Sequence, residues 1–161
     1  MEKDLREGLR AQMVFEMDSA YIYMGMAAWF TNNNWNGFSK FMYRQAKEEV
    51  EHAMKIYKFL GDLGSEIFFD ALNAPKRDYK SVEEVFEAAF EHEKLVTSNV
   101  NALYERAVSE KNYAVERFLG WFVEEQVEEE ATFSDITTVL KGIDGNFSGL
   151  YLYDKELGKR E

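Results

Sequence analysis

A carboxylate and an imidazole stand three residues apart in the segment Glu49-Val50-Glu51-His52. At that spacing Glu49 and His52 share one face of a helix. The face is otherwise mainly apolar and recurs every three or four residues, at Phe38, Phe41, Gln45, Glu49, His52, Ile56, Phe59 and Leu63. A carboxylate on such a face must be paired or bound to a metal ion, because bare buried charge is costly. A Glu-x-x-His pair directed into a helical bundle presents two ligands to one transition metal.

Three other amphipathic segments also carry acid near the middle of an apolar stripe. These interruptions are Glu16 in the first segment, Glu93 in the third, and Glu125, Gln126 and Glu129 in the fourth. One such Glu is usually a charge at the rim of the core. Four segments with acid at matching heights are hard to explain as independent accidents, so the pattern predicts one shared metal site.

The composition limits the fold and the kind of metal. The chain has 161 residues, of which 46% are hydrophobic and 16% aromatic, so we expect one domain, 1–161, with a sizeable core. It has no cysteine, which excludes disulfides and thiolate metal sites. The remaining ligands, carboxylate and imidazole, suit iron or manganese, and zinc less exclusively.

The charge and hydropathy patterns limit the kinds of partner that the protein can bind. A formal net charge of −11 argues against nucleic-acid binding, which needs a basic surface, and favours attraction of cations. The N-terminal residues show no signal-like apolar run, and no segment is long and apolar enough to cross a membrane. We therefore expect a cytoplasmic protein with no membrane association.

Helical periodicity and punctuation predict four long helices and a short fifth. The first three cover about residues 4–31, 35–61 and 81–110, and the fourth follows a tight turn at Lys111-Asn112 and ends at Gly142. Ser81 and Glu84 form a capping box at the start of the third helix. The four-helix bundle thus spans about residues 4–141, and the fifth helix about 147–158. So short a helix is marginal alone, so Leu150, Leu152 and Leu157 should pack on the bundle or on another subunit.

Connection lengths predict the topology. Short turns make the first and second helices antiparallel, and likewise the third and fourth. The segment 64–80, about 17 residues long, can reach ~55 Å when extended. A helix of about 27 residues is only ~40 Å long, so this segment can return along the whole bundle. The sequence therefore predicts an all-α four-helix bundle with one long crossover.

With these elements in place, the chain resembles the non-haem bacterial ferritins of the ferritin-like di-iron superfamily. The resemblance covers nearly the whole chain and is carried by a set of motifs: Glu16 and Tyr23, Glu48-Glu49-x-x-His52, Glu91-His92-Glu93, Trp121-x-x-x-Glu125-Gln126-x-x-Glu129, and Leu150-Tyr151-x-x-Asp154-Lys155-Glu156-Leu157. Each motif is weak alone, but the set in this order is specific. It implies a ferritin-like bundle with a short C-terminal helix.

The resemblance also implies a site. Iron site A would comprise Glu16, Glu49 and His52, and Glu49 would bridge to site B. The members of site B would be Glu93 and Glu129, with Gln126 nearby. A third iron site would use Glu48, Glu125, Glu128 and Glu129. Glu49, His52 and Tyr23 would take part in catalysis.

The implied function is iron storage with ferroxidase activity. Paired Fe(II) would be oxidised by O2 or H2O2, and the Fe(III) mineral would be kept inside a hollow homo-oligomeric shell of 24 subunits. At two places the sequence differs from related di-iron proteins, and these differences refine the expectation. Site B has Gln126-x-x-Glu129 in place of a second Glu-x-x-His, which suits iron in transit. Val50 stands where bacterioferritins carry a haem-ligating Met, so we expect no haem.

Two alternatives compete with iron storage. A rubrerythrin-like di-iron oxidase or peroxidase would share the fold, but the chain has no cysteine for a rubredoxin-type site. A metal-free acidic bundle that serves as an interaction module would tolerate, or gain stability from, Leu in place of the buried Glu residues. Nearby, His92 lies one step off its stripe, and Glu130 flanks the expected ligands. Both are expected to face solvent.

Overall fold

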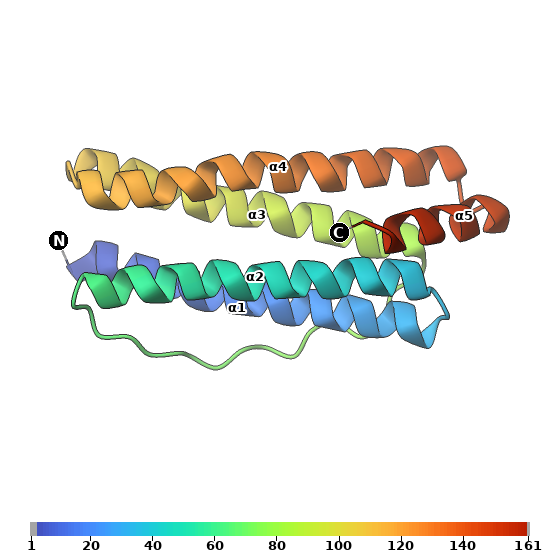
Figure 1. Cartoon of the computed structure of the whole chain (residues 1–161), viewed down its shortest axis with the longest axis horizontal. Coiled ribbons are helices and arrows are strands. Elements are labelled where there is room, and N and C mark those ends of the chain that lie inside the picture. The colour runs from blue at the N-terminus through green and yellow to red at the C-terminus, as the bar shows by residue number, and fades with distance from the viewer. Residues whose placement is uncertain (1–2, 161) are drawn as a thin grey trace.

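Five α-helices make up the computed structural model, which describes residues 3–160. They are α1 Lys3–Asn32, α2 Asn36–Asp62, α3 Val82–Ser109, α4 Tyr113–Ile143 and α5 Phe147–Gly158, and no strand occurs within these residues. The four long helices form a bundle, and the short α5 lies across one end of it (Figure 1). The predicted all-α fold and its five helices are confirmed.

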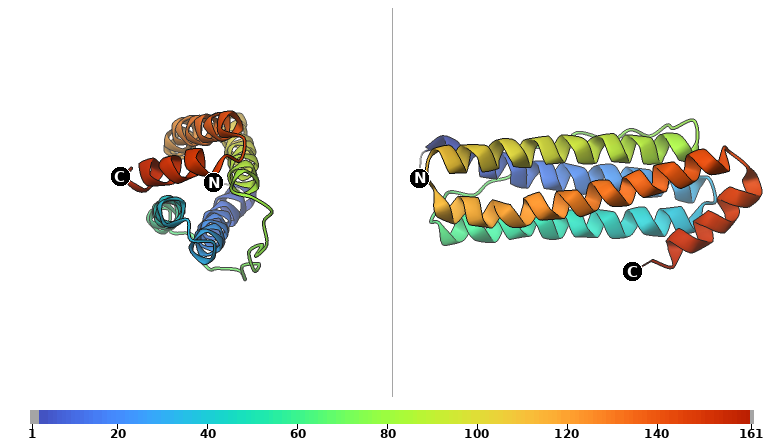
Figure 2. Two further views of the ribbon diagram at one scale, coloured as in Figure 1. Left: turned by 90° about the vertical axis from the view of Figure 1, so that its right-hand side faces the viewer. Right: turned by 90° about the horizontal axis from the view of Figure 1, so that it is seen from above.

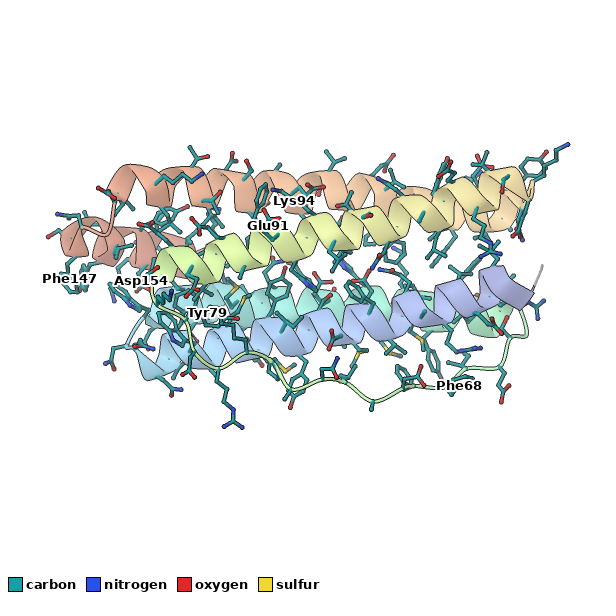
Figure 3. The ribbon with its side chains drawn as sticks, turned by 180° about the vertical axis from the view of Figure 1, so that it is seen from behind. Phe68, Tyr79, Glu91, Lys94, Phe147 and Asp154 are labelled. Atoms are coloured by element: carbon teal, nitrogen blue, oxygen red, sulfur yellow. The ribbon has the colours of Figure 1, made fainter. Side chains whose placement is uncertain are left out.

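The segment 63–81 is the long crossover that the connection lengths predicted. It leaves the C-terminal end of α2 and returns along the outside of the bundle to the opposite end, where α3 begins (Figures 1 and 2). It lies against α1: the guanidinium of Arg10 is 4.0 Å from the centre of the Phe68 ring, and Pro75 packs on Gly25. Phe68 and Tyr79 mark its two ends in Figure 3. Helices α2 and α3 therefore run parallel.

The core is divided into two apolar clusters. One contains Phe30, Phe38, Phe86 and Phe133 with their neighbours, and the other contains Leu9, Met13, Ile56, Val96 and Phe122 with theirs. Buried polar side chains from all four long helices lie on the same helix faces between the clusters. The sequence interruptions of the apolar stripes thus become a polar layer inside the bundle.

Local hydrogen bonds fix the start of α3. The Glu84 backbone N–H donates to Ser81 Oγ at 3.1 Å, as the capping motif predicted. The Glu84 carboxylate accepts from the backbone N–H of Lys80 instead of that of Ser81. These two bonds satisfy the backbone N–H of Glu84, in the first turn of α3, and that of Lys80, which precedes the N-cap residue Ser81.

Helix α5 docks on its own chain at the start of α2. The residue before α2, Trp35, makes no side-chain capping bond, and the Phe38 backbone N–H donates to Asp154 Oδ1 at 2.8 Å instead. The helices approach so closely that a Cβ on Gly37 would collide with the backbone of Asp154. Asp154 therefore caps α2 from 116 residues away.

Only part of the predicted packing of α5 occurs within one chain. Leu150, Tyr153 and Leu157 are buried in the first core cluster. Leu152, which we expected to pack, is 69% exposed, and Phe147 is 70% exposed. The reason is geometric: residues 150, 153 and 157 follow the inner face of the helix, whereas residue 152 lies on the opposite face. Phe147 is the first residue of α5, and its ring contacts the edge of the bundle at Trp35. Phe147 and Asp154 are labelled in Figure 3.

Candidate metal centre

Six polar residues of the predicted site lie buried in the layer between the two apolar clusters. They come from all four long helices: Glu16, Glu49, His52, Glu93, Gln126 and Glu129. Helical spacing of three or four residues puts each on the inner face of its helix. Four carboxyl groups and one imidazole thus share a space that contains no lysine or arginine partner for them among the described residues. Such a cluster is stable only with protons or cations between the carboxylates.

The first group of converging donors joins α1 and α2. Glu16, Glu49 and His52 each place one donor atom within 4.8 Å of the others. The His52 Nδ1 lies 3.2 Å from Glu49 Oε2 and 3.9 Å from Glu16 Oε2. Gln12 Nε2 donates to Glu16 Oε1 at 2.9 Å, while the buried Glu16 Oε2 accepts no hydrogen bond from residues 3–160. A carboxylate oxygen that accepts no hydrogen bond, beside an imidazole nitrogen, is a suitable pair of ligands for a divalent cation.

The second group of donors joins α2, α3 and α4. Glu49, Glu93 and Glu129 again place donor atoms within 4.8 Å of one another. The Tyr23 hydroxyl donates to Glu93 Oε1, and Gln126 Nε2 donates to Glu93 Oε2 at 3.0 Å. Because Glu49 belongs to both groups, its carboxylate lies between them. A shared carboxylate is the feature that a pair of adjacent metal ions requires.

Hydrogen bonds from outside the two groups hold the ligand carboxylates. Gln45 Nε2 donates to Glu129 Oε2 at 2.9 Å, from one turn before Glu49 on α2. Gln12 lies one turn before Glu16 on α1 and donates to Glu16 itself. These supporting amides were not identified as site residues from the sequence, although both lie on the apolar stripes, four residues before a predicted ligand. A Gln on an apolar stripe, four residues before a predicted ligand, is the sequence signal by which these two amides could have been identified.

The electrostatics of the layer favour cation binding. Burial raises the pKa of Glu16 and of Glu49 well above the usual carboxyl range, and neighbouring carboxylates add to the shift. Burial, followed by the charge of Glu93, raises the pKa of Glu129 to about 8. Burial also raises the pKa of Tyr23, so its hydroxyl stays a donor. Bound cations would reverse the penalty on the carboxylates, because they would be the largest local charges.

The residues expected to form a third site are only partly brought together. Glu125 belongs to a third group of close donors, with His52 and Glu129, and its side chain is 24% exposed. Glu48 is half-buried and Glu128 is exposed, and neither belongs to any such group within residues 3–160. The third iron site stays a prediction.

Two neighbours do not face solvent as we expected. His92 is half-buried: its Nε2 lies 2.7 Å from Ser19 Oγ, and its ring stacks on Phe15 at 5.4 Å between centroids. Glu130 is also half-buried and accepts a hydrogen bond from Thr97 Oγ1 at 2.7 Å. Both predictions were wrong because the two residues lie where one helix packs against another. The neighbouring helix covers such residues, and the apolar stripe of their own helix gives no sign of this.

No helix in the described part of the chain is long and apolar enough to cross a membrane.

Comparisons with known proteins agree with this geometry. Residues 6–143 match the family model of the ferritin-like domain. A bacterial non-heme ferritin of Staphylococcus aureus is 42% identical over 160 residues, which cover 99% of this chain and 96% of that protein. A probable bacterial non-heme ferritin-like protein of Haemophilus influenzae is 41% identical over 150 residues, covering 93% and 91%.

The backbone is similar to that of a solved ferritin. The open pore ferritin of the archaeon Archaeoglobus fulgidus superposes with a TM-score of 0.98 at 38% identity, covering 100% of this chain and 99% of that one. The family match, the relatives and the fold all extend over nearly the whole chain. The chain therefore belongs to the ferritin family of iron-storage proteins.

Proposed function

We propose that this protein is a ferroxidase that oxidises Fe(II) with O2 or H2O2 and stores the Fe(III) product as mineral inside a homo-oligomeric shell. The observation that carries the proposal is the position of Glu49, whose carboxylate belongs to both groups of converging donors. Iron is the substrate and the cargo here. Two Fe(II) ions held side by side can each give one electron to the same oxidant molecule. With protons from the solvent, these two electrons would reduce O2 to H2O2, or H2O2 to water.

The residues divide between the two iron positions. Glu16, Glu49 and His52 would hold one Fe(II), and Glu49, Glu93 and Glu129 the other. The second position has only carboxylate donors. Carboxylates are hard ligands that suit iron, and this position has no imidazole. The absence of an imidazole at this position suits iron in transit, as expected from the sequence.

Tyr23 and Gln126 act on the second position. Tyr23 donates to one oxygen of Glu93 and Gln126 donates to the other, so the plane of this carboxylate is fixed before iron arrives. Fixing a ligand in this way raises metal affinity without a further metal bond. In this proposal Tyr23, which we expected to take part in catalysis, is a positioning residue that acts through the ligand Glu93, and Gln126 supports the same ligand.

The proposal includes a shell of 24 subunits in the cytoplasm, with no haem. The outer face of α5, formed by Phe147, Tyr151 and Leu152, is exposed in one chain and would be covered by neighbouring subunits. A net charge of −11 would draw Fe(II) towards the shell. The third iron site at Glu48, Glu125, Glu128 and Glu129 completes the proposal as the sequence predicted it.

Stopped-flow absorption after mixing with Fe(II) and O2 tests the central role of Glu49. Glu49→Ala and His52→Ala should abolish the fast oxidation phase, because each removes a ligand of the first position. Glu51→Ala, which removes an exposed carboxylate from the same turn, should leave the fast phase unchanged. Light scattering should show the same assembly for all variants. A normal fast phase in Glu49→Ala would show that the site is assigned wrongly.

A further inference from the structure

The two ring nitrogens of His52 face different carboxylates. The Nδ1 faces the first iron position, 3.2 Å from Glu49 Oε2. The Nε2 faces the other way and lies 3.8 Å from Glu125 Oε1. Two groups of close donors, one with Glu16 and Glu49 and one with Glu125 and Glu129, therefore depend on the same imidazole.

One neutral imidazole cannot serve both groups as a metal ligand. A neutral imidazole has a lone pair on one nitrogen and a proton on the other. When Nδ1 binds a metal ion, Nε2 carries the proton and becomes a donor. The group with Glu125 then contains an N–H in place of a ligand, and this N–H needs an acceptor because a buried donor without one is costly.

The surroundings of His52 leave Glu125 as that acceptor. His52 is buried, and the Trp121 and Phe122 rings meet it edge-on at 5.3 and 6.1 Å between centroids. The ammonium of Lys55 lies over the Trp121 ring, 3.5 Å from its centre. Within residues 3–160, no hydrogen bond ties the Glu125 carboxylate to another group, so it is able to move towards His52.

We propose that Glu125 is a positioning residue for the first iron position: it accepts the His52 Nε2–H and so holds the imidazole with Nδ1 directed at the metal. A movement of less than about 1 Å brings the pair from 3.8 Å to hydrogen-bond distance. A carboxylate behind a metal-bound histidine fixes its tautomer and ring orientation and raises its basicity. The inference rests on the proposed metal centre and gives Glu125 a role at the first iron position, in addition to its proposed role as a third-site ligand.

Titration with Co(II), followed by its visible absorption, separates the two roles. Glu125→Ala removes the acceptor, and we expect the affinity of the imidazole-containing position to fall about 10- to 100-fold. Glu125→Gln keeps an oxygen that can accept from Nε2–H, so the affinity and the spectrum of the first position should match the wild type. Any loss of metal at the third iron site, where Glu125 is a proposed ligand, is measured separately. Glu124→Ala, which removes an exposed carboxylate next along α4, is the matched control and should change nothing.

A double-mutant cycle shows whether the effect passes through His52. In a His52→Ala background, adding Glu125→Ala should cause no further loss at the first position. Wild-type affinity in Glu125→Ala would overturn the inference, and so would an equal loss in Glu125→Ala and Glu125→Gln, which would point to a charge or ligand role. A wild-type protein that binds no pair of Co(II) ions would instead contradict the proposed function itself.

Discussion

The Glu129 carboxyl makes the stability of the metal-free protein depend on pH. Burial raises its folded-state pKa to about 8, from 4.5 for the free group. Between these two values the folded chain keeps the proton and the unfolded chain loses it, so rising pH favours unfolding. Each pH unit in this window costs about 1.4 kcal/mol. At pH 7 the metal-free fold is therefore destabilised by about 3 kcal/mol through this residue alone.

Glu129→Gln removes this penalty, because an amide needs no proton. Its side-chain oxygen can still accept from Gln45 Nε2, which donates to Glu129 Oε2 at 2.9 Å. The variant should be about 3 kcal/mol more stable than the wild type at pH 7, without metal, and no more stable at pH 4. For a chain of this size that gain raises Tm by roughly 6–12 °C.

Differential scanning calorimetry with a chelator, at pH 4 and pH 7, measures the effect. Glu128→Gln changes the exposed neighbouring carboxylate in the same way and should leave Tm unchanged. Added Co(II) should reverse the order at pH 7, since the wild type keeps all its metal ligands. An equal gain at both pH values, or no gain at pH 7, would refute the burial argument. A gain that Co(II) leaves unaffected would favour a metal-free acidic bundle.

Three other changes test the elements around the site. Tyr23→Phe removes the hydroxyl that donates to Glu93, so the second metal ion should bind about tenfold more weakly in a Co(II) titration, with no change in far-UV circular dichroism. Asp154→Ala leaves the Phe38 N–H without its acceptor and should lower stability by about 2 kcal/mol in calorimetry, whereas Asp154→Asn should retain most of it. Deletion of residues 147–161 should leave the four long helices folded but reduce the fraction of complete shells in light scattering, and full shell yield would show that α5 is dispensable.

The helices and most residues of the candidate metal centre could be predicted from the sequence because both depend on local spacing. A residue three or four places from another on a helix shares its face, whatever the rest of the fold does. The acid at mid-height in four apolar stripes therefore indicated one buried layer. The crossover followed from length alone, since the segment before α3 is long enough to return along the bundle.

Contacts between distant elements could not be predicted in this way. The cap that Asp154 provides for α2 depends on how α5 docks, and no spacing rule connects residues 116 positions apart. The partial burial of His92 depends on the neighbouring helix, which covers a residue that its own stripe places outside the core. The direction of each His52 nitrogen, which decides the role of Glu125, is likewise a property of the packed bundle.

Crystals soaked with Fe(II) under anaerobic conditions test the central claim most directly, through anomalous difference maps at the iron edge. We predict two iron peaks per chain about 3.5–4 Å apart, with one oxygen of Glu49 bound to each ion. His52 Nδ1 should bind only the ion that Glu16 also binds. A single peak, or a pair of peaks in which Glu49 contacts only one ion or neither, would contradict the assignment of Glu49 as the bridging carboxylate.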